Sequence, residues 1–342
     1  MDSLTQIVLG AAVGEAVLGK KAGNKAMVWG AIAGTIPDLD VLSGYFLSDF
    51  DSLLFHRGIT HSILFAILSA PVLAYFVNKI HSKSDPTFRD WLNLFFWCVF
   101  IHPLLDIFTN YGTQLFYPFS DYRVAFNTIF VIDLLYTLPL LIGCILVFRQ
   151  KDTYKRWKIN RLSLVLSTAY LILTCINKWY IEEKVLEKIK NQNIAYFDFM
   201  TTPAPFTNIL WSVIIKEEDQ FRVGYYSWFD GSDSLHLTSI RRKEELLQDF
   251  LPSEKVEQLI IFSKGFYELE NTSNGLIFND LRFSTISGWF NVDDAYIFSF
   301  RLEKENDDVS IFRIEPEGRL NKENFIKLLS RITGNNLQIN GK

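Results

Sequence analysis

The sequence predicts an α-helical membrane bundle of about five or six apolar helices, some of them half-length, followed by a small α+β soluble domain. Three observations favour this fold class. The low-charge, apolar sequence lies almost entirely before about residue 180. Its apolar segments approach the roughly 20 residues that a helix needs to cross a bilayer core. After residue 182 the pattern changes to short strands and amphipathic helices. We therefore predict two domains, residues 1–182 and 183–342.

The N-terminal domain contains the apolar segments 4–19, 26–47, 61–80, 91–109, 128–148 and 162–180. The first has no basic region and no cleavage site, so we interpret it as a retained helix rather than a signal peptide. The last two are the clearest spans, whereas the first two are short or interrupted. A soluble helical bundle is the alternative, but its helices would show a polar stripe that 61–77 and 128–148 lack.

Basic residues mark alternate connections between these segments. They are Lys20, Lys21, Lys25, Lys79, Lys83, Arg89, Arg149, Lys151, Lys155, Arg156, Lys158 and Arg161. By the positive-inside tendency these connections are cytoplasmic, and the connections 37–60 and 110–127 lie outside. The pattern predicts a multi-pass protein of the cell (inner) membrane whose C-terminal domain is extracytoplasmic.

The C-terminal domain is predicted from short alternating runs. "NILWSVIIKEEDQFRVGYYSWFD" favours two strands around a polar turn at 216–220, and further strands are expected in "GLIFNDLRFSTISGWF", "AYIFSFRLEKE" and "VSIFRIEPE". "RKEELLQDFLPSEKVEQLIIFSKGFYEL" indicates two short amphipathic helices broken at Pro252.

Charge and cysteine content argue against a nucleic-acid-binding protein and against a zinc site with thiolate ligands. The formal net charge is -4, whereas a nucleic-acid binder needs a basic surface. The three cysteines lie in apolar runs without a CxxC pair, so they are expected to be buried small hydrophobes and not zinc ligands. The expected partners are membrane lipids.

Four polar clusters interrupt the apolar segments. They are "PDLD" at 37–40, "HRGITHS" at 56–62, "HPLLD" at 102–106 and "VID" at 131–133. The predicted topology brings all four to the outer face of the membrane, at a depth where ionisable groups are costly and tend to be functional. Imidazoles and carboxylates are ligands of zinc, manganese and iron. The sequence therefore predicts a centre for one or two divalent ions, Zn²⁺ or Mn²⁺, with the ligands Asp38, Asp40, His56, His61, His102, Asp106 and Asp133.

Several of these residues have a second interpretation. Asp40 is either a ligand or the general base that takes a proton from water. Asp133 could instead cap a helix, pair with Arg57 or orient a histidine. His102 alone could be a satisfied structural residue. Arg57 is expected to bind an anionic group of the substrate, or else to form a salt bridge with a nearby aspartate.

The motifs "MDSLTQIVLGAAVGEAVLG", "GTIPDLD", "HRGITHS", "HPLLDIFTNYGTQLFYPFSDYR" and "TTPAPFTNILWSV" resemble those of the YdjM-like family of inner-membrane-associated, metal-dependent hydrolases. The resemblance covers about the first 215 residues. It implies a membrane location and a site formed by Asp38, Asp40, His56, His61, His102 and Asp106. Many relatives carry a histidine at the position of Gln6.

These observations predict a membrane-bound, metal-dependent hydrolase acting at the outer interface. Its expected substrate is a phosphoester or another lipid-linked, amphiphilic molecule. A membrane amidase or esterase is the first alternative, although no HExxH motif is present. The second is a non-enzymatic membrane protein with a structural metal site and a partner-binding soluble domain.

Overall fold

The computed structural model describes residues 1–83, 85–231, 235–291, 294–305, 308–318 and 321–335. The chain forms two compact units, Met1–Phe46 with Ser52–Ile176, and Leu47–Asp51 with Asn177–Lys342. The predicted boundary after residue 182 lies inside α7 (Thr153–Asn191), a helix that contributes residues to both units.

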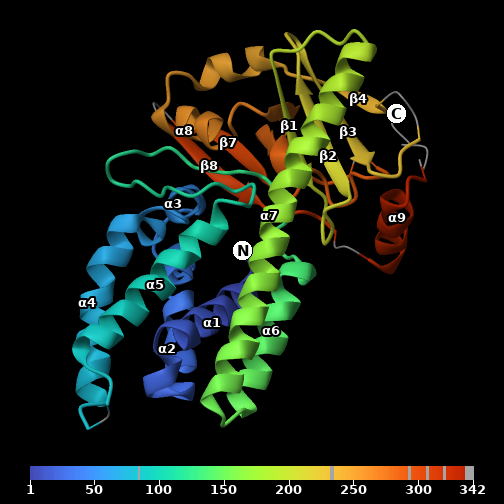
Figure 1. Ribbon diagram of the computed structural model, residues 1–342. Coiled ribbons are helices and arrows are strands. Elements are labelled where there is room, and N and C mark those ends of the chain that lie inside the picture. Colours follow the sequence, from blue (N-terminus) through green and yellow to red (C-terminus); the bar gives the residue numbers. More distant parts are fainter. Residues whose placement is uncertain (84, 232–234, 292–293, 306–307, 319–320, 336–342) are drawn as a thin grey trace. The chain divides into compact units, whose positions relative to one another are not determined.

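The N-terminal unit is helical, and each predicted apolar segment contains a helix (Figure 1). Its elements are α1 (Ser3–Ala22), α2 (Asn24–Thr35), the 3₁₀ helix η1 (Pro37–Tyr45), α3 (Asp49–Phe55), η2 (Ile59–His61), α4 (Ile63–Ile80), α5 (Phe88–Asp106), α6 (Leu134–Arg149) and the first part of α7. The predicted segment 26–47 is thus divided, with α2 ending before Pro37.

Two helices in the described part of the chain, α4 and α7, are long and apolar enough to cross a membrane. Only 22% of the residues in the apolar window of each are buried. Apolar side chains such as Leu68 on α4 and Leu173 on α7 are exposed, and a lipid environment would cover them. α6 is apolar but shorter. Membrane crossing by five or six helices therefore stays a prediction.

Glycines allow α1 and α2 to pack backbone against backbone. Gly10 and Gly14 of α1 lie against Gly30 and Gly34 of α2, and a methyl group at any of the four would overlap a backbone oxygen of the other helix. This is the small-residue spacing by which membrane helices approach closely. The contact fixes Gly34 at the end of α2, directly before the candidate ligands of η1.

Replacing Gly14 by leucine is expected to destabilise the N-terminal unit. The added side chain has no space beside the backbone of Ala26, and overpacking typically costs about 1–3 kcal/mol. Thermal unfolding of the detergent-solubilised protein measures the effect, with Gly231→Ala as the control because a methyl group there meets no atom within 4 Å. An unchanged unfolding temperature for Gly14→Leu would contradict this packing.

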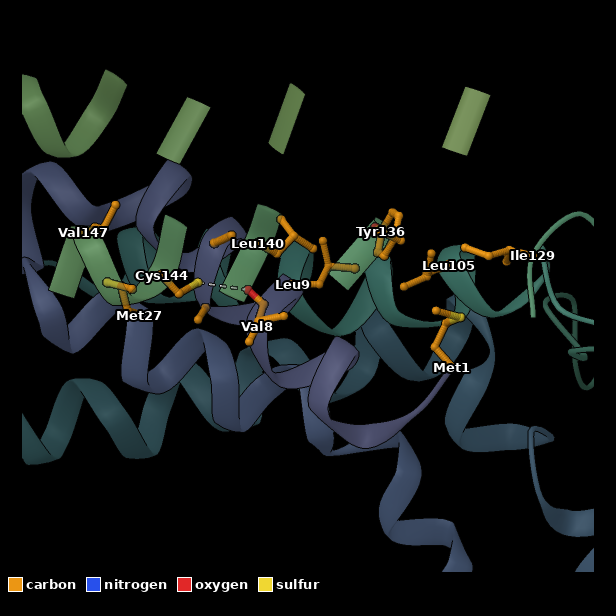
Figure 2. Packing of buried hydrophobic residues seen from close by; sticks show 12 residues of the cluster. Met1, Val8, Leu9, Met27, Leu105, Ile129, Tyr136, Leu140, Cys144 and Val147 are labelled. Carbon is orange, nitrogen blue, oxygen red and sulfur yellow. Dashed lines mark hydrogen bonds between the residues drawn. The ribbon is translucent and has the colours of Figure 1, made fainter. Parts of the chain in front are cut away.

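α1 and α6 enclose an apolar core (Figure 2). Leu9, Leu140 and Val147 are buried there, and Cys144 donates its S–H to the carbonyl oxygen of Val8 over 3.4 Å. Cys98, Cys144 and Cys175 are all free thiols. The expected burial is therefore confirmed for Cys98 and Cys144, and Cys175 is partly buried.

The C-terminal unit contains two four-stranded antiparallel sheets, each with its strands in chain order. The first comprises β1 (Asp198–Pro203), β2 (Leu210–Lys216), β3 (Gln220–Ser227) and β4 (Leu237–Arg241), and the second comprises β5 (Tyr267–Thr272), β6 (Gly275–Asp280), β7 (Ser299–Glu305) and β8 (Asp308–Ile314). The helical elements are η3 (Glu244–Phe250), α8 (Glu254–Phe262), η4 (Leu281–Phe283) and α9 (Lys322–Ile332). The end of α7 packs on the first sheet through Ile181, Val185 and Ile189.

Candidate metal centre

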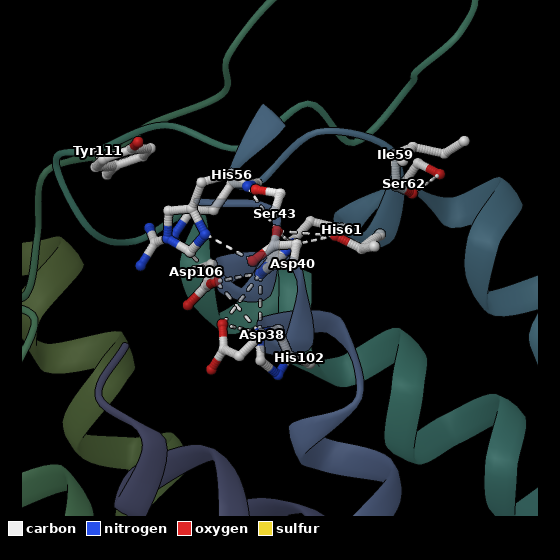
Figure 3. Close-up of polar contacts among 12 residues, drawn as sticks. Asp38, Asp40, Ser43, His56, Ile59, His61, Ser62, His102, Asp106 and Tyr111 are labelled. Atoms are coloured by element: carbon white, nitrogen blue, oxygen red, sulfur yellow. Dashed lines mark hydrogen bonds and ion pairs between the residues drawn. The ribbon is translucent and has the colours of Figure 1, made fainter. Parts of the chain in front are cut away.

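Three segments that are distant in sequence bring the candidate ligands together (Figure 3). The first is η1, which begins at Pro37, a residue suited to a first helical turn because it has no N–H to satisfy. A 3₁₀ helix has three residues per turn, so side chains two positions apart point in different directions. Asp38 and Asp40 consequently lie on different sides of His61, and each reaches a different nitrogen of its ring.

The second segment is the end of α5. This helix starts with a capping box in which Thr87 and Asp90 satisfy each other's backbone N–H groups. His102 and Asp106 follow in the last turns, four residues apart on one face of the helix. Both side chains are fully buried.

The third segment is the turn 56–61. Arg57 adopts a left-handed conformation with φ 58°, and its backbone N–H donates to Asp40 Oδ2 over 3.0 Å. Arg123 supports the turn by donating to the carbonyl oxygens of Leu54 and His56. η2 then places His61 directly before Ser62, whose hydroxyl caps α4.

Asp38, His61, His102 and Asp106 each direct one ligand atom to a common position, with all four atoms within 4.8 Å of one another. The Nε2 atoms of His61 and His102 are 3.1 Å apart. Asp38 Oδ1 lies 3.4 and 3.3 Å from these two nitrogens, and Asp106 Oδ2 lies 3.4 and 3.5 Å from them. Five of the six separations are therefore 3.1–3.5 Å.

These five separations are close to those around a tetrahedral divalent ion, and the sixth, between Asp38 and Asp106, lies within 4.8 Å. Two atoms bound at about 2.0–2.1 Å to such an ion lie about 3.3–3.4 Å apart, which is the spacing of these ligands. Among the residues that the structure describes, the buried Oδ2 of Asp106 has no hydrogen-bond partner. That oxygen makes ion-pair contacts of 3.4–3.5 Å with Arg57 Nε and with the Nε2 atoms of both histidines, and a bound cation would complete its pairing.

The outer nitrogens of both histidines are held by protein groups. His102 Nδ1 lies 2.6 Å from the carbonyl oxygen of Gly34, and His61 Nδ1 lies 3.2 Å from Asp40 Oδ2. A carbonyl or carboxylate at Nδ1 keeps the proton there and leaves Nε2 with a lone pair for the ion. This arrangement is typical of histidines that bind metals.

Asp40 and His56 lie beside the four ligand residues and outside their set. Asp40 accepts from the backbone of Arg57 and from the Thr60 hydroxyl, in addition to its contact with His61. Its Oδ1 is 2.8 Å from His56 Nδ1. The His56 side chain is 29% exposed, so it joins the buried centre to the outside.

Arg57 brings a buried positive charge to the centre. Its Nε is 3.4 Å from Asp106 Oδ2, one terminal nitrogen donates to the Thr109 hydroxyl over 2.7 Å, and its guanidinium faces the ring of Tyr111. The side chain is 5% exposed. Among the described residues, its Nε has an ion-pair contact with Asp106 but no hydrogen bond. The guanidinium therefore keeps a donor for a further acceptor.

The charges of the centre favour a cation. Burial alone would raise the pKa of the Asp38 carboxyl, but hydrogen bonds from His102 and His61 outweigh it and hold the pKa well below its usual value. Hydrogen bonds outweigh burial at Asp40 as well and lower its pKa. Burial opposes the charged form of His61, yet hydrogen bonds with Asp106, Asp38 and Asp40 raise its pKa to about 10. The carboxylates thus draw a proton onto His61, and a divalent ion would replace it.

Asp133 lies apart from the four ligands, at the start of α6. Its Oδ1 accepts from the backbone N–H groups of Leu135 and Tyr136, and its Oδ2 accepts from the Tyr170 hydroxyl over 2.8 Å. These contacts correspond to the helix cap that the sequence left open as an alternative.

Other groups at the centre were not selected from the sequence. Gln6 donates to Asp106 Oδ1 over 3.0 Å, so its amide holds the carboxylate from the side of α1. The amino group of Met1 contacts the same oxygen. Thr109 and Tyr111 lie in "HPLLDIFTNYGTQLFYPFSDYR", one of the motifs that carry the family resemblance. The Gly34 carbonyl has no signal in the sequence, because every residue has a carbonyl group.

The chain is similar to known proteins. A profile of the YdjM inner membrane protein family matches residues 1–181, which include all four ligand residues, Asp40, His56 and Arg57. The chain is 30% identical over 148 residues to the uncharacterized protein YfhP of Bacillus subtilis strain 168, across 39% of this chain and 42% of that protein. It is 35% identical over 96 residues to the inner membrane protein YbcI of Escherichia coli K12, across 28% of this chain and 54% of that protein.

The chain spans about half the length of these curated relatives. No solved structure matches it. The family match covers more than half of the chain and includes the whole helical unit with its candidate metal centre. The chain therefore belongs to the YdjM inner membrane protein family.

Proposed function

We propose that this protein is a membrane-bound, metal-dependent hydrolase that acts at the extracytoplasmic membrane interface on a phosphoester of a lipid-linked or amphiphilic substrate. The observation that carries the proposal is the group Asp38, His61, His102 and Asp106, whose ligand atoms all lie within 4.8 Å of one another beside the buried guanidinium of Arg57. A divalent ion there supplies a Lewis acid that polarises an ester oxygen and activates water. Zn²⁺ and Mn²⁺ suit this set of nitrogen and oxygen ligands.

Arg57 favours a phosphoester among the hydrolysable bonds. Its guanidinium is buried, is held by Thr109 and Tyr111, and has an Nε without a hydrogen bond in the described part of the chain. A planar guanidinium matches the geometry of phosphate oxygens and stabilises the charge that develops on them. An amide or a carboxylic ester has no anionic group of this kind in its ground state, so the amidase and esterase alternatives receive less support.

His56 is the group that we propose to move a proton. Asp40 holds its Nδ1, so Nε2 is the atom that exchanges a proton with the attacking water or the leaving group. Asp40 accepts from several donors, and its pKa is lowered, so it is a weak base. Its role is to orient His56 and His61, and the catalytic role expected from the sequence becomes an indirect one.

A structural metal site is the second candidate. Four protein ligands at tetrahedral spacing can close the coordination sphere, which is the usual arrangement of structural zinc. In that case the protein would bind the ion to hold η1, η2 and α5 together, and the soluble unit would carry a separate binding function.

A hydrolase assay on the variant His56→Gln distinguishes the catalytic metal site from the structural one. Protein loaded with Zn²⁺ or Mn²⁺ and reconstituted in lipid is assayed against phosphoester, carboxylic ester and amide amphiphiles. We expect phosphoester hydrolysis, and we expect His56→Gln to lower kcat about 100- to 10,000-fold with the metal content unchanged. His236→Gln, an exposed histidine of the other unit, is the control. Hydrolysis of no substrate class, together with loss of thermal stability on metal removal, would favour the structural site.

A further inference from the structure

Exposed aromatic side chains surround α7 where it enters the C-terminal unit. Trp179 is 66% exposed, Trp228 is 52% exposed and Phe229 is 60% exposed. Tyr180 packs against Trp228 with ring centroids 5.3 Å apart, and Phe206 is also exposed. We name Trp179, Tyr180, Phe206, Trp228 and Phe229 the aromatic collar.

Hydrogen bonds hold the three segments of the collar together. Asn177 of α7 donates to the carbonyl oxygen of Asn208, in the loop that contains Phe206. The indole N–H of Trp228 donates to Asn177 Oδ1 over 2.9 Å. The rings stay exposed although the indole N–H of Trp228 is satisfied, and a soluble surface seldom shows so many large rings in one place.

The collar begins where the uncharged part of α7 ends. No charged side chain occurs between Arg161 and Lys178, and exposed residues of this stretch such as Leu166 and Ile172 are apolar. Before it, Tyr154 and Trp157 stack on each other, with Lys158 and Arg161 against their rings. Aromatic residues bracketing an apolar stretch, with basic residues at one end, are typical of a membrane helix.

The spacing of the two aromatic groups matches a bilayer. Trp157 and Trp179 are 22 positions apart. A helix rises about 1.5 Å per residue, so they are separated by about 33 Å. The hydrocarbon core of a bilayer is about 30 Å thick, so both tryptophans fall at its boundaries.

We infer that the aromatic collar seats the C-terminal unit on the lipid headgroups at the extracytoplasmic end of α7. Trp and Tyr rings, apolar with one polar atom, suit this boundary. Trp228 and Phe229 belong to the sheet unit and not to the membrane helix, so the collar adds a second attachment to the covalent one. It restricts the unit to one depth at the membrane surface.

Tryptophan quenching in reconstituted full-length protein tests the inference without a metal or a substrate. Vesicles of phosphatidylcholine carry bromine either near the headgroup or near the chain ends. We expect stronger quenching by the shallow bromine. The double change Trp179→Phe with Trp228→Phe is expected to lower it to the share contributed by Trp157 at the other boundary. Trp289→Phe is the matched control, because Trp289 is buried in the same unit and should leave the quenching unchanged.

A gain of signal gives a second measurement. Phe229→Trp is expected to add shallow quenching, whereas Phe197→Trp is expected to add quenching by aqueous acrylamide alone. Phe197 is 71% exposed and follows the end of α7. That end lies about 18 Å beyond Trp179 along the helix. Collar tryptophans quenched by acrylamide and not by brominated lipid would overturn the inference, as would their protection from both by a second copy of the chain. Either of these results would leave the hydrolase proposal unaffected, because the quenching experiment involves no metal and no substrate.

Discussion

Replacing His61 and His102 together by alanine is expected to remove the divalent ion from the purified protein. The two Nε2 atoms lie 3.1 Å apart and supply half of the four ligand atoms. Even the outer partners of a metal ligand typically change affinity about 10- to 100-fold, and the loss of two ligands exceeds that. Elemental analysis of protein purified in detergent should give about one ion per wild-type chain and none for the double variant.

The matched control is His56→Ala. This histidine belongs to the same loop and contacts Asp40, but it lies outside the four ligand residues, so the ion should remain. Metal content at the wild-type level in the double variant would show that the ligand assignment is wrong. Loss of the ion in His56→Ala would show instead that the ligand set is larger than the four residues.

The general location of the candidate site was predictable from the sequence. Polar clusters at the ends of apolar segments are expensive to bury, so their recurrence at one end of the bundle pointed to a shared site. The helix spacing of His102 and Asp106 was also sufficient to place them on one face. These predictions used only local periodicity and the order of the segments.

The group of four residues that could hold an ion was not predictable in full from the sequence, and Asp38 and Asp40 show why. In an extended segment, two carboxylates two positions apart face the same side, so both were expected at the centre, Asp38 as a ligand and Asp40 as either a ligand or the general base. The segment is instead the 3₁₀ helix η1, which turns through a different angle per residue and sends Asp40 to the outer nitrogen of His61. Whether a carboxylate binds an ion or orients a ligand thus depends on a backbone conformation that hydrophobic periodicity does not reveal.

The strands of the C-terminal unit were likewise predictable only in part. β2 and β3 with their polar turn were predicted, as were β6, β7 and β8, because their apolar residues alternate or run together. The second predicted helix was expected to reach residue 269, but α8 ends at Phe262 and β5 begins at Tyr267. β1, "DFMTTP", was missed because it is short and ends in Pro203, which suits only an edge strand. Its pairing with β2 supplies the structure that its own sequence does not indicate.

Metal affinity is expected to rise with pH. In the metal-free centre, hydrogen bonds with Asp106, Asp38 and Asp40 overcome burial and raise the pKa of His61 to about 10. At pH 7 the ion must therefore displace a proton from His61, whereas Asp38, with its lowered pKa, is already charged. Since one proton leaves for each ion bound, affinity should fall about tenfold for each unit of pH between 8 and 6.

The stability of the metal-free protein should change with pH in the opposite direction. A histidine whose pKa is raised by folding stabilises the native state below its unfolded pKa of about 6.5, and this contribution is lost as pH rises towards 10. Isothermal titration in buffers of different ionisation enthalpy counts the released protons, and thermal unfolding without metal follows the stability.

Asp40→Asn removes one of the groups that raise the pKa of His61. The metal affinity of this variant should therefore stop rising at a lower pH than that of the wild-type protein. An affinity that stays constant between pH 6 and 8 would mean that His61 does not exchange its proton for the ion.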